Sequence, residues 1–131
     1  MNKEILIICR GGGDLATGIV HRLFRAGYQV LILETAEPAA IRRQVSFCEA
    51  VYEGTATVEG VTAERIYTAK KQAVEEVLQR GRIPLLVDPD GRSIEILKPD
   101  VVVDAIIAKK NLGTYKEMAP LVIGIGPGFV A

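Results

Sequence analysis

Apolar and polar positions near the start of the chain follow the order expected for a strand, a turn, a helix and a second strand. An apolar run at 5–9 leads into three glycines at 11–13, and a second apolar run at 30–33 leads into Glu34. Between them, apolar residues recur every three or four positions and stop before Gly27. This period predicts a helix with one buried face that ends at this glycine. The buried stripe expected of that helix is Leu15, Ile19 and Leu23, with Ala16, Val20 and Phe24 beside it.

The rest of the chain alternates between strand and helix patterns. This alternation predicts an α/β fold with a Rossmann-like open, mainly parallel sheet flanked by helices. Thr68 and Gly81 should bound one helix. After a turn at 88–91, we expect 94–97 to return as a β-hairpin inserted in the sheet. The strands expected are 50–53 with its return 57–61, then 84–87, 101–104 and 121–123.

The composition favours one folded domain. The chain has 131 residues and 49% of them are apolar, which is enough for a core of its own and argues against disorder. We therefore expect 1–131 to form a single Rossmann-like nucleotide-binding domain. Its apolar end, 129–131, directly follows Gly-Pro-Gly, whereas natural termini are usually polar and frayed. This end favours the N-terminal part of a longer protein.

Charge and hydropathy exclude several classes of partner. Lys plus Arg and Asp plus Glu both number 16, and no basic arm suggests a nucleic-acid partner. No apolar run approaches the ~20 residues of a membrane span, and the chain enters its first strand without a secretion signal. Cys9 and Cys48 lack the spacing of a zinc site or a redox pair, so both should be buried, reduced thiols. These features predict a cytoplasmic protein.

The glycine spacing is the strongest functional signal. Gly11-x-Gly13-x-x-Ala16 fits the G-x-G-x-x-G/A form, in which the glycines allow a tight turn and a close approach to phosphate. Glu34 follows about twenty residues later, where a ribose-binding acid is expected. Together with Gly12, these residues predict a dinucleotide with its pyrophosphate on the helix N-terminus. The alternative is a βαβ unit whose glycines serve only chain reversal and packing.

Two charged residues flank this motif. Arg10 precedes the first glycine and could contact a ligand phosphate, while Asp14 lies in the first helical turn. Asp14 could cap the helix, pair with Arg10, or hold a cation that bridges to phosphate. Capping or pairing is favoured because no second acid lies nearby. His21 is the only histidine, so no histidine-rich metal site is expected.

Residues that follow the later strands are further candidates, because ligands of open α/β sheets bind at the carboxyl ends of strands. Gly124 and Gly126 lie in a second glycine-rich turn, which is either an anion-binding nest or a flexible exit from the sheet. Asp104 ends an apolar strand and Lys109 follows it. These two are the candidates for an acid–base group beside a nicotinamide ring.

A second spacing is weaker. Tyr67-x-x-x-Lys71 matches the acid–base pair of short-chain dehydrogenases, and on one helix the two residues would share a face. The partner serine of that family is not evident. The favoured interpretation is an exposed pair near the start of a helix.

Glu34 also bears on which dinucleotide is bound. A carboxylate accepts both ribose hydroxyls in charge-assisted hydrogen bonds, worth about 1.5–3 kcal/mol. A 2′-phosphate would face it charge to charge. The hypothesis is therefore NAD(H), or another nucleotide with an unphosphorylated ribose, in preference to NADP.

Four blocks of sequence carry a family resemblance. They are 9–18 with 21–23, 42–47 with 50–54, 104–111, and 119–129. Over essentially the whole chain they resemble the YqeB-type accessory proteins of the selenium-dependent molybdenum hydroxylase system, whose members continue into a second domain. The resemblance implies a role in maturing a molybdenum hydroxylase. Its partners would be that hydroxylase or its cofactor-insertion machinery, and a homodimer is left open.

Two classes of function are therefore carried forward. The first is an accessory module that binds a dinucleotide, molybdopterin dinucleotide included, through its glycine-rich turn. The second is an NAD-dependent oxidoreductase or an NAD-sensing regulatory domain. Whether the protein is an enzyme is left open.

Overall fold

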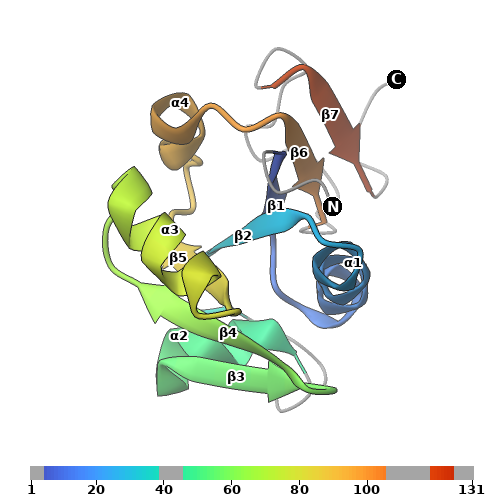
Figure 1. Ribbon diagram of the computed structural model, residues 1–131, viewed down its shortest axis with the longest axis vertical. Coiled ribbons are helices and arrows are strands. Elements are labelled where there is room, and N and C mark those ends of the chain that lie inside the picture. Colours follow the sequence, from blue (N-terminus) through green and yellow to red (C-terminus); the bar gives the residue numbers. More distant parts are fainter. Residues whose placement is uncertain (1–4, 39–45, 106–118, 126–131) are drawn as a thin grey trace.

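The computed structural model describes residues 5–38, 46–105 and 119–125. The described part is an α/β fold with one seven-stranded sheet in the order β3-β4-β5-β2-β1-β6-β7 (Figure 1). In chain order the elements are β1 (Leu6–Arg10), α1 (Asp14–Arg25), β2 (Gln29–Glu34), the 3₁₀ helix η2 (Phe47–Glu49), α2 (Ala50–Glu53), β3 (Thr55–Val58), β4 (Val61–Ile66), α3 (Lys71–Gln79), β5 (Ile83–Val87), α4 (Ser93–Leu97), β6 (Val101–Asp104) and β7 (Leu121–Gly124). The prediction of a Rossmann-like, mainly parallel open sheet flanked by helices is confirmed.

The order of the strands reverses at β1. From β1 the chain passes through α1 to β2 on one side, and it later returns to β6 on the other side. All neighbouring strands run parallel except the antiparallel pair β3–β4. In open α/β sheets, ligands bind in the crevice at such a reversal, beyond the carboxyl ends of the strands. The residues that follow β1, β2 and β6 are therefore the ones expected to bind a ligand.

Each face of the sheet has its own apolar layer, because successive residues of a strand point to opposite faces. Val30 and Ile32 of β2 pack on the layer that contains α1, η2 and α2. Leu31 and Leu33 pack on the layer that contains α3 and α4. Burying one such side chain contributes about 1.5–3 kcal/mol. Two covered faces explain why the central strands are continuously apolar.

Helix α1 buries a narrower stripe than its sequence predicts. Ala16, Thr17 and Val20 are the buried residues, while Leu15 is 51% exposed. Successive helical residues lie 100° apart, so Leu15 stands beside the stripe centred on Ala16 and Val20. The prediction that Leu15 is buried was wrong. Gly27 follows the helix with φ 96°, the left-handed geometry expected of a glycine there.

Two expected strands are helices. Residues Ala50–Glu53 form α2, which Gly54 ends with φ 85° in the left-handed region. Residues Ser93–Leu97 include the segment expected to return as a hairpin, and they form α4. Asp88 explains α4, because its carboxylate accepts the backbone N–H groups of Arg92 at 3.1 Å and of Ser93 at 2.8 Å. Such capping satisfies the first amides of a helix.

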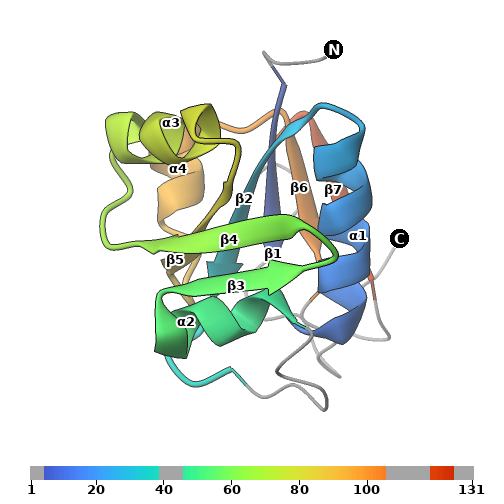
Figure 2. The same ribbon diagram turned by 60° about the horizontal axis from the view of Figure 1, so that its bottom comes forward.

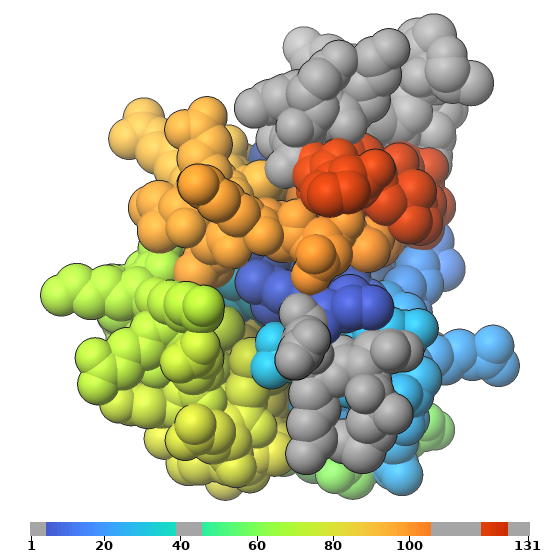
Figure 3. All heavy atoms as spheres, turned by 45° about the horizontal axis from the view of Figure 1, so that its top comes forward, coloured from blue at the N-terminus to red at the C-terminus, as the bar shows by residue number. Residues whose placement is uncertain are grey.

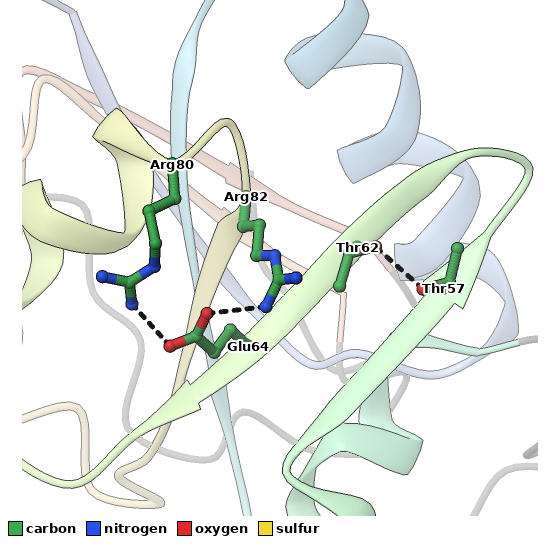
Figure 4. A network of polar contacts seen from close by, with 5 residues as sticks. All are labelled: Thr57, Thr62, Glu64, Arg80 and Arg82. Carbon is green, nitrogen blue, oxygen red and sulfur yellow. Dashed lines mark hydrogen bonds and ion pairs between the residues drawn. The ribbon is translucent and has the colours of Figure 1, made fainter.

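A β-hairpin is present, but at β3–β4. Its turn is formed by Glu59 and Gly60, both with positive φ, at 46° and 81°. Positive φ at both central residues suits the right-handed twist of the flanking strands. The hydroxyls of Thr57 and Thr62 are hydrogen-bonded across the pair at 2.8 Å (Figure 4). Figure 2 shows the hairpin crossing in front of the parallel strands.

Helix α3 begins later than expected. Its N-cap is Lys70, and the Thr68 hydroxyl accepts the Lys70 N–H at 3.3 Å. Val74 and Val77 are its buried residues, as the apolar period predicts. Gly81 follows with φ 74°.

An ion-pair network ties the end of α3 and the start of β5 to β4. Glu64 accepts one hydrogen bond from Arg80 at 2.6 Å and one from Arg82 at 3.0 Å (Figure 4). Partial burial opposes ionisation, but the hydrogen bonds from the two guanidinium groups hold the pKa of Glu64 below its usual value. The network lies at the surface, where such pairs contribute little, roughly 0–1 kcal/mol each.

Strand β7 ends the sheet next to β6. Its residues reach the molecular surface, where Figure 3 shows them in red. Leu121 is 51% exposed and Ile123 is 43% exposed. In the part of the chain that the structure describes, no helix combines the length and the apolar character needed to cross a membrane.

Candidate functional site

The glycine turn connects β1 to α1 with the geometry that its spacing predicts. Gly11 has φ 108°, a backbone conformation that residues other than glycine rarely adopt. Its N–H donates to the Leu33 carbonyl at 2.7 Å, which ties the turn to the end of β2. Gly13 is the N-cap of α1. The turn therefore delivers the helix N-terminus to the carboxyl edge of the sheet.

Glu34 points at this turn. One carboxylate oxygen accepts the Gly12 N–H at 2.6 Å, and the other accepts the Thr35 N–H at 2.9 Å. Partial burial raises the pKa of Glu34, although both backbone hydrogen bonds act to lower it. A carboxylate offers about four acceptor positions, and these two hydrogen bonds use two of them. Each oxygen keeps the capacity to accept one further donor.

A segment distant in sequence closes one side of the turn. We call Ser46, Phe47 and Cys48 the 46–48 wall; all three are buried. The Cys48 N–H donates to the Gly12 carbonyl at 2.9 Å. The Thr17 hydroxyl accepts the Phe47 N–H at 3.0 Å and donates to the Gly12 carbonyl at 3.1 Å. Buried side chains and backbone hydrogen bonds fix the wall in place.

The two sides of the turn differ in the space around them. A Cβ atom at Gly12 would lie 3.2 Å from the Cys48 nitrogen, which is tighter than nine in ten real Cβ contacts. A Cβ atom at Gly13 would meet nothing within 4 Å. The Gly12 side is therefore packed against the wall, while the Gly13 side faces open space.

Asp14 belongs to the first turn of α1, after the N-cap Gly13. Its carboxylate accepts a hydrogen bond from the Ser46 hydroxyl at 2.5 Å. A negative charge here is favourable, because the helix N-terminus carries about half a positive charge. Asp14 thus links α1 to the 46–48 wall, and it is not the N-cap that one interpretation of the sequence expected.

Arg10 and Asp104 are the last residues of β1 and β6. Both are 1% exposed, and they are opposite each other in the register of β1 and β6. By alternation from Ile8 and Val102, both side chains project to the face that carries α3 and α4. The Arg10 guanidinium donates to the Pro89 carbonyl at 2.9 Å. Arg10 is therefore directed to the 88–91 turn and away from the glycine turn.

The remaining candidates are divided between the core and the edge of the sheet. Ala16 is buried against the sheet, where its small side chain permits close packing. Gly124 ends β7 and is paired in register with Asp104. Lys109 and Gly126 lie outside the described residues. Within the ranges that the structure describes, no cluster of three or more His, Cys, Asp or Glu side chains could hold a metal ion.

Both cysteines are free and buried, as expected. Burial first, and then the nearby carboxylates of Asp104 and Glu34, raise the pKa of Cys9 to about 12. Burial and neighbouring carboxylates, Glu34 foremost, raise the pKa of Cys48 to about 11. The reactive form of a cysteine is the thiolate, so both side chains should be inert in the folded protein.

We therefore expect iodoacetamide at about pH 8 to leave both thiols unmodified in the native protein and to alkylate both after unfolding in urea. Intact mass spectrometry counts the modified sites. The unfolded sample is the control for reagent and exposure time. Rapid alkylation of Cys48 in the native protein would show that the 46–48 wall opens.

Sequence reasoning missed the wall and its partner Thr17. The contacts join residues about thirty positions apart, and no local period or spacing encodes them. The signal that could have found the segment is the resemblance block at 42–47, which contains Ser46 and Phe47.

Comparison with known proteins identifies one named relative. No family model matches the chain, and no solved structure matches it. The chain is 49% identical over 126 residues to the uncharacterized protein YqeB of Escherichia coli (strain K12). This similarity covers 96% of the chain, which spans 23% of the length of YqeB. Over nearly its whole length, then, the chain is similar to one portion of YqeB.

Proposed function

We propose that this chain is a nucleotide-binding domain of a cytoplasmic accessory protein that helps to mature a molybdenum hydroxylase. Its ligand is a dinucleotide, NAD(H) or a molybdenum-cofactor nucleotide such as molybdopterin dinucleotide. The observation that carries the proposal is the Glu34 carboxylate, held beside the glycine turn by the N–H groups of Gly12 and Thr35.

The turn and the carboxylate suit different parts of such a ligand. Two acceptor positions of Glu34 remain for the two hydroxyls of a ribose. A phosphate approaches from the open Gly13 side, where the N-terminus of α1 favours negative charge. Among the described residues the 46–48 wall closes the other side, so the Gly13 side is the proposed direction of approach.

The hydrogen bonds of Glu34 also favour an unphosphorylated ribose. The two backbone N–H groups fix its carboxylate at the turn. A 2′-phosphate would meet a negative charge that cannot swing aside without giving up both hydrogen bonds. NAD(H) is therefore the preferred nicotinamide nucleotide.

The part of the proposal that concerns molybdenum has separate support. It comes from the four resemblance blocks, which lead to the selenium-dependent molybdenum hydroxylase system. The similarity to YqeB agrees with those blocks. The hydroxylase, or the machinery that inserts its cofactor, is the proposed protein partner.

An NAD-dependent oxidoreductase or NAD sensor is the second candidate. Asp104 favours it, because it ends β6 at the reversal of strand order, where a nicotinamide ring would lie. An acid–base group must reach the reacting ring, and Asp104 is only 1% exposed. The accessory function therefore ranks first.

Calorimetric titration with NAD⁺, NADP⁺ and molybdopterin dinucleotide tests the proposal. We expect NAD⁺ to bind more tightly than NADP⁺. In Glu34→Gln the affinity for NAD⁺ should fall by about 5- to 30-fold, because charge-assisted hydrogen bonds become neutral ones, which are weaker by about 1 kcal/mol each. Glu95→Gln, the same change at an exposed position of α4, should bind as the unaltered protein does.

The pH dependence sharpens this test. The raised pKa of Glu34 means that its accepting, ionised form is complete above that pKa and is lost as the pH falls through it. Affinity should therefore decline at a higher pH than an ordinary glutamate, with a pKa of about 4.3, would dictate. Glu34→Gln should lack this decline. Absence of binding by all three nucleotides, or tighter binding of NADP⁺, would contradict the proposal.

A further inference from the structure

We infer that Tyr67 is the platform on which the base of the bound nucleotide stacks. This inference rests on the proposed function and adds a contact to it. Tyr67 follows β4, two strands away from Glu34, and it is 77% exposed. At this exposure the ring buries little of its surface against the described residues, although it lies at the carboxyl edge of the sheet.

The strand register aligns Tyr67 with Glu34. Glu34 is paired with Val87 across β2 and β5, and Ile66 is paired with Leu86 across β5 and β4. Tyr67 is therefore the next position in the row that contains Val87 and Glu34. At about 4.8 Å between neighbouring strands, its backbone lies about 10 Å from that of Glu34. Figure 1 shows β2, β5 and β4 side by side in this order.

The direction of the ligand follows from the same row. The glycine turn and the N-terminus of α1 lie on the β1 side of Glu34. In a nucleotide the phosphate and the base leave the ribose at opposite ends. A ribose on Glu34 with its phosphate near Gly13 therefore sends its base away from β1, across the ends of β5 and β4.

Arg65 contacts one face of the Tyr67 ring. Its guanidinium lies 4.6 Å from the centroid of the Tyr67 ring, within the range of a cation–π contact. The same guanidinium donates to the Val51 carbonyl at 2.5 Å, which anchors it to α2. One face of the ring is thus covered by a fixed cation, and the high exposure of Tyr67 leaves the ring accessible. Base–aromatic stacking is worth about 1–3 kcal/mol per base.

This role differs from the one that the Tyr67-x-x-x-Lys71 spacing suggested. Lys71 is the first residue of α3, whereas Tyr67 precedes the helix. The two side chains do not share a helical face, so the acid–base pair of a short-chain dehydrogenase has no counterpart here. Tyr67 contributes its ring rather than its hydroxyl.

The test compares ADP with the base-free ligand ribose 5-phosphate, by calorimetry, on three proteins. Tyr67→Ala should bind ADP about 5- to 150-fold more weakly than the unaltered protein, the range that one base stack predicts. Tyr67→Phe keeps the ring and should bind ADP within about twofold of the unaltered protein. Ribose 5-phosphate should bind all three equally. Thermal melting verifies that the exposed substitution leaves the fold intact.

Each other outcome has a distinct meaning. If Tyr67→Ala binds ADP normally while Glu34→Gln is weakened, the base lies elsewhere; this inference fails and the proposed function stands. If Tyr67→Phe is weakened as much as Tyr67→Ala, the hydroxyl makes the contact and stacking is wrong. If the unaltered protein binds neither ligand, this inference fails, and the separate titration with NAD⁺, NADP⁺ and molybdopterin dinucleotide decides the proposed function.

Discussion

Replacing Arg10 with alanine should lower the free energy of unfolding by about 2–5 kcal/mol. The side chain is 1% exposed and is among the largest that the fold buries completely. Its removal leaves a cavity and takes the donor from the Pro89 carbonyl, which accepts the guanidinium at 2.9 Å. It also removes the positive charge opposite Asp104, a carboxylate that is itself 1% exposed. Denaturation in urea, followed by circular dichroism, measures the loss.

Arg92→Ala is the matched control for this substitution. Its side chain is 85% exposed, and it lies on the same loop that Arg10 contacts through Pro89. Surface changes of this kind usually stay within about 0.5 kcal/mol. A loss below about 1 kcal/mol in Arg10→Ala would show that the residue is not needed to hold the 88–91 turn.

Gly12→Ala should mainly lower the stability of the fold, whereas Gly13→Ala should mainly lower the affinity for the nucleotide. At Gly12 the new methyl group meets the Cys48 backbone at 3.2 Å, and that backbone is held by its own hydrogen bond to Gly12. Overpacking of this kind costs about 1–3 kcal/mol of stability. At Gly13 the methyl group enters open space, and the backbone there is extended, with φ −74°. Stability should fall by less than about 1 kcal/mol, the cost of a poorer N-cap.

For nucleotide affinity, in contrast to stability, Gly13→Ala is the variant that we expect to be impaired. The Gly13 methyl group stands on the side from which we propose that phosphate approaches, so Gly13→Ala should lose affinity for NAD⁺ while it remains folded. Urea denaturation and calorimetry on both variants provide the two readouts. Normal NAD⁺ binding by Gly13→Ala would place the phosphate elsewhere. Unchanged stability in Gly12→Ala would mean that the 46–48 wall shifts to accommodate the new methyl group.

The parts of the fold that sequence predicted well are those encoded by local pattern. The continuous apolar runs became buried parallel strands, and the spacing from Gly11 to Glu34 became a turn beside a strand tip. Both follow from interactions between chain neighbours or from burial on two faces. These are also the features that carry the proposed function.

The errors arose where a short apolar segment fits two structures. In 94–97, apolar residues at alternate positions suggested a strand. The structure buries Ile94 at 3% exposure and leaves Ile96 63% exposed, a division that a helix makes and that one face of a strand does not. Asp88 decides the outcome by capping α4, and its five-residue distance from Ser93 lies outside the usual capping pattern.

The 46–48 wall shows a different limit. Its contacts with Gly12 and Thr17 depend on how the whole sheet brings distant segments together. No spacing near the glycines indicates that a second segment packs there. Sequence therefore predicted the turn but not the side from which it is closed.

The hydrogen bonds of the wall also have an electronic consequence. The peptide group that joins Gly12 to Gly13 receives two donors at its oxygen, one from Cys48 and one from Thr17. Hydrogen bonds polarise one another through a shared amide, by about 10–30% per bond. Electron density is thus drawn from the nitrogen of that amide, and the N–H of Gly13 becomes a stronger donor than an ordinary backbone group.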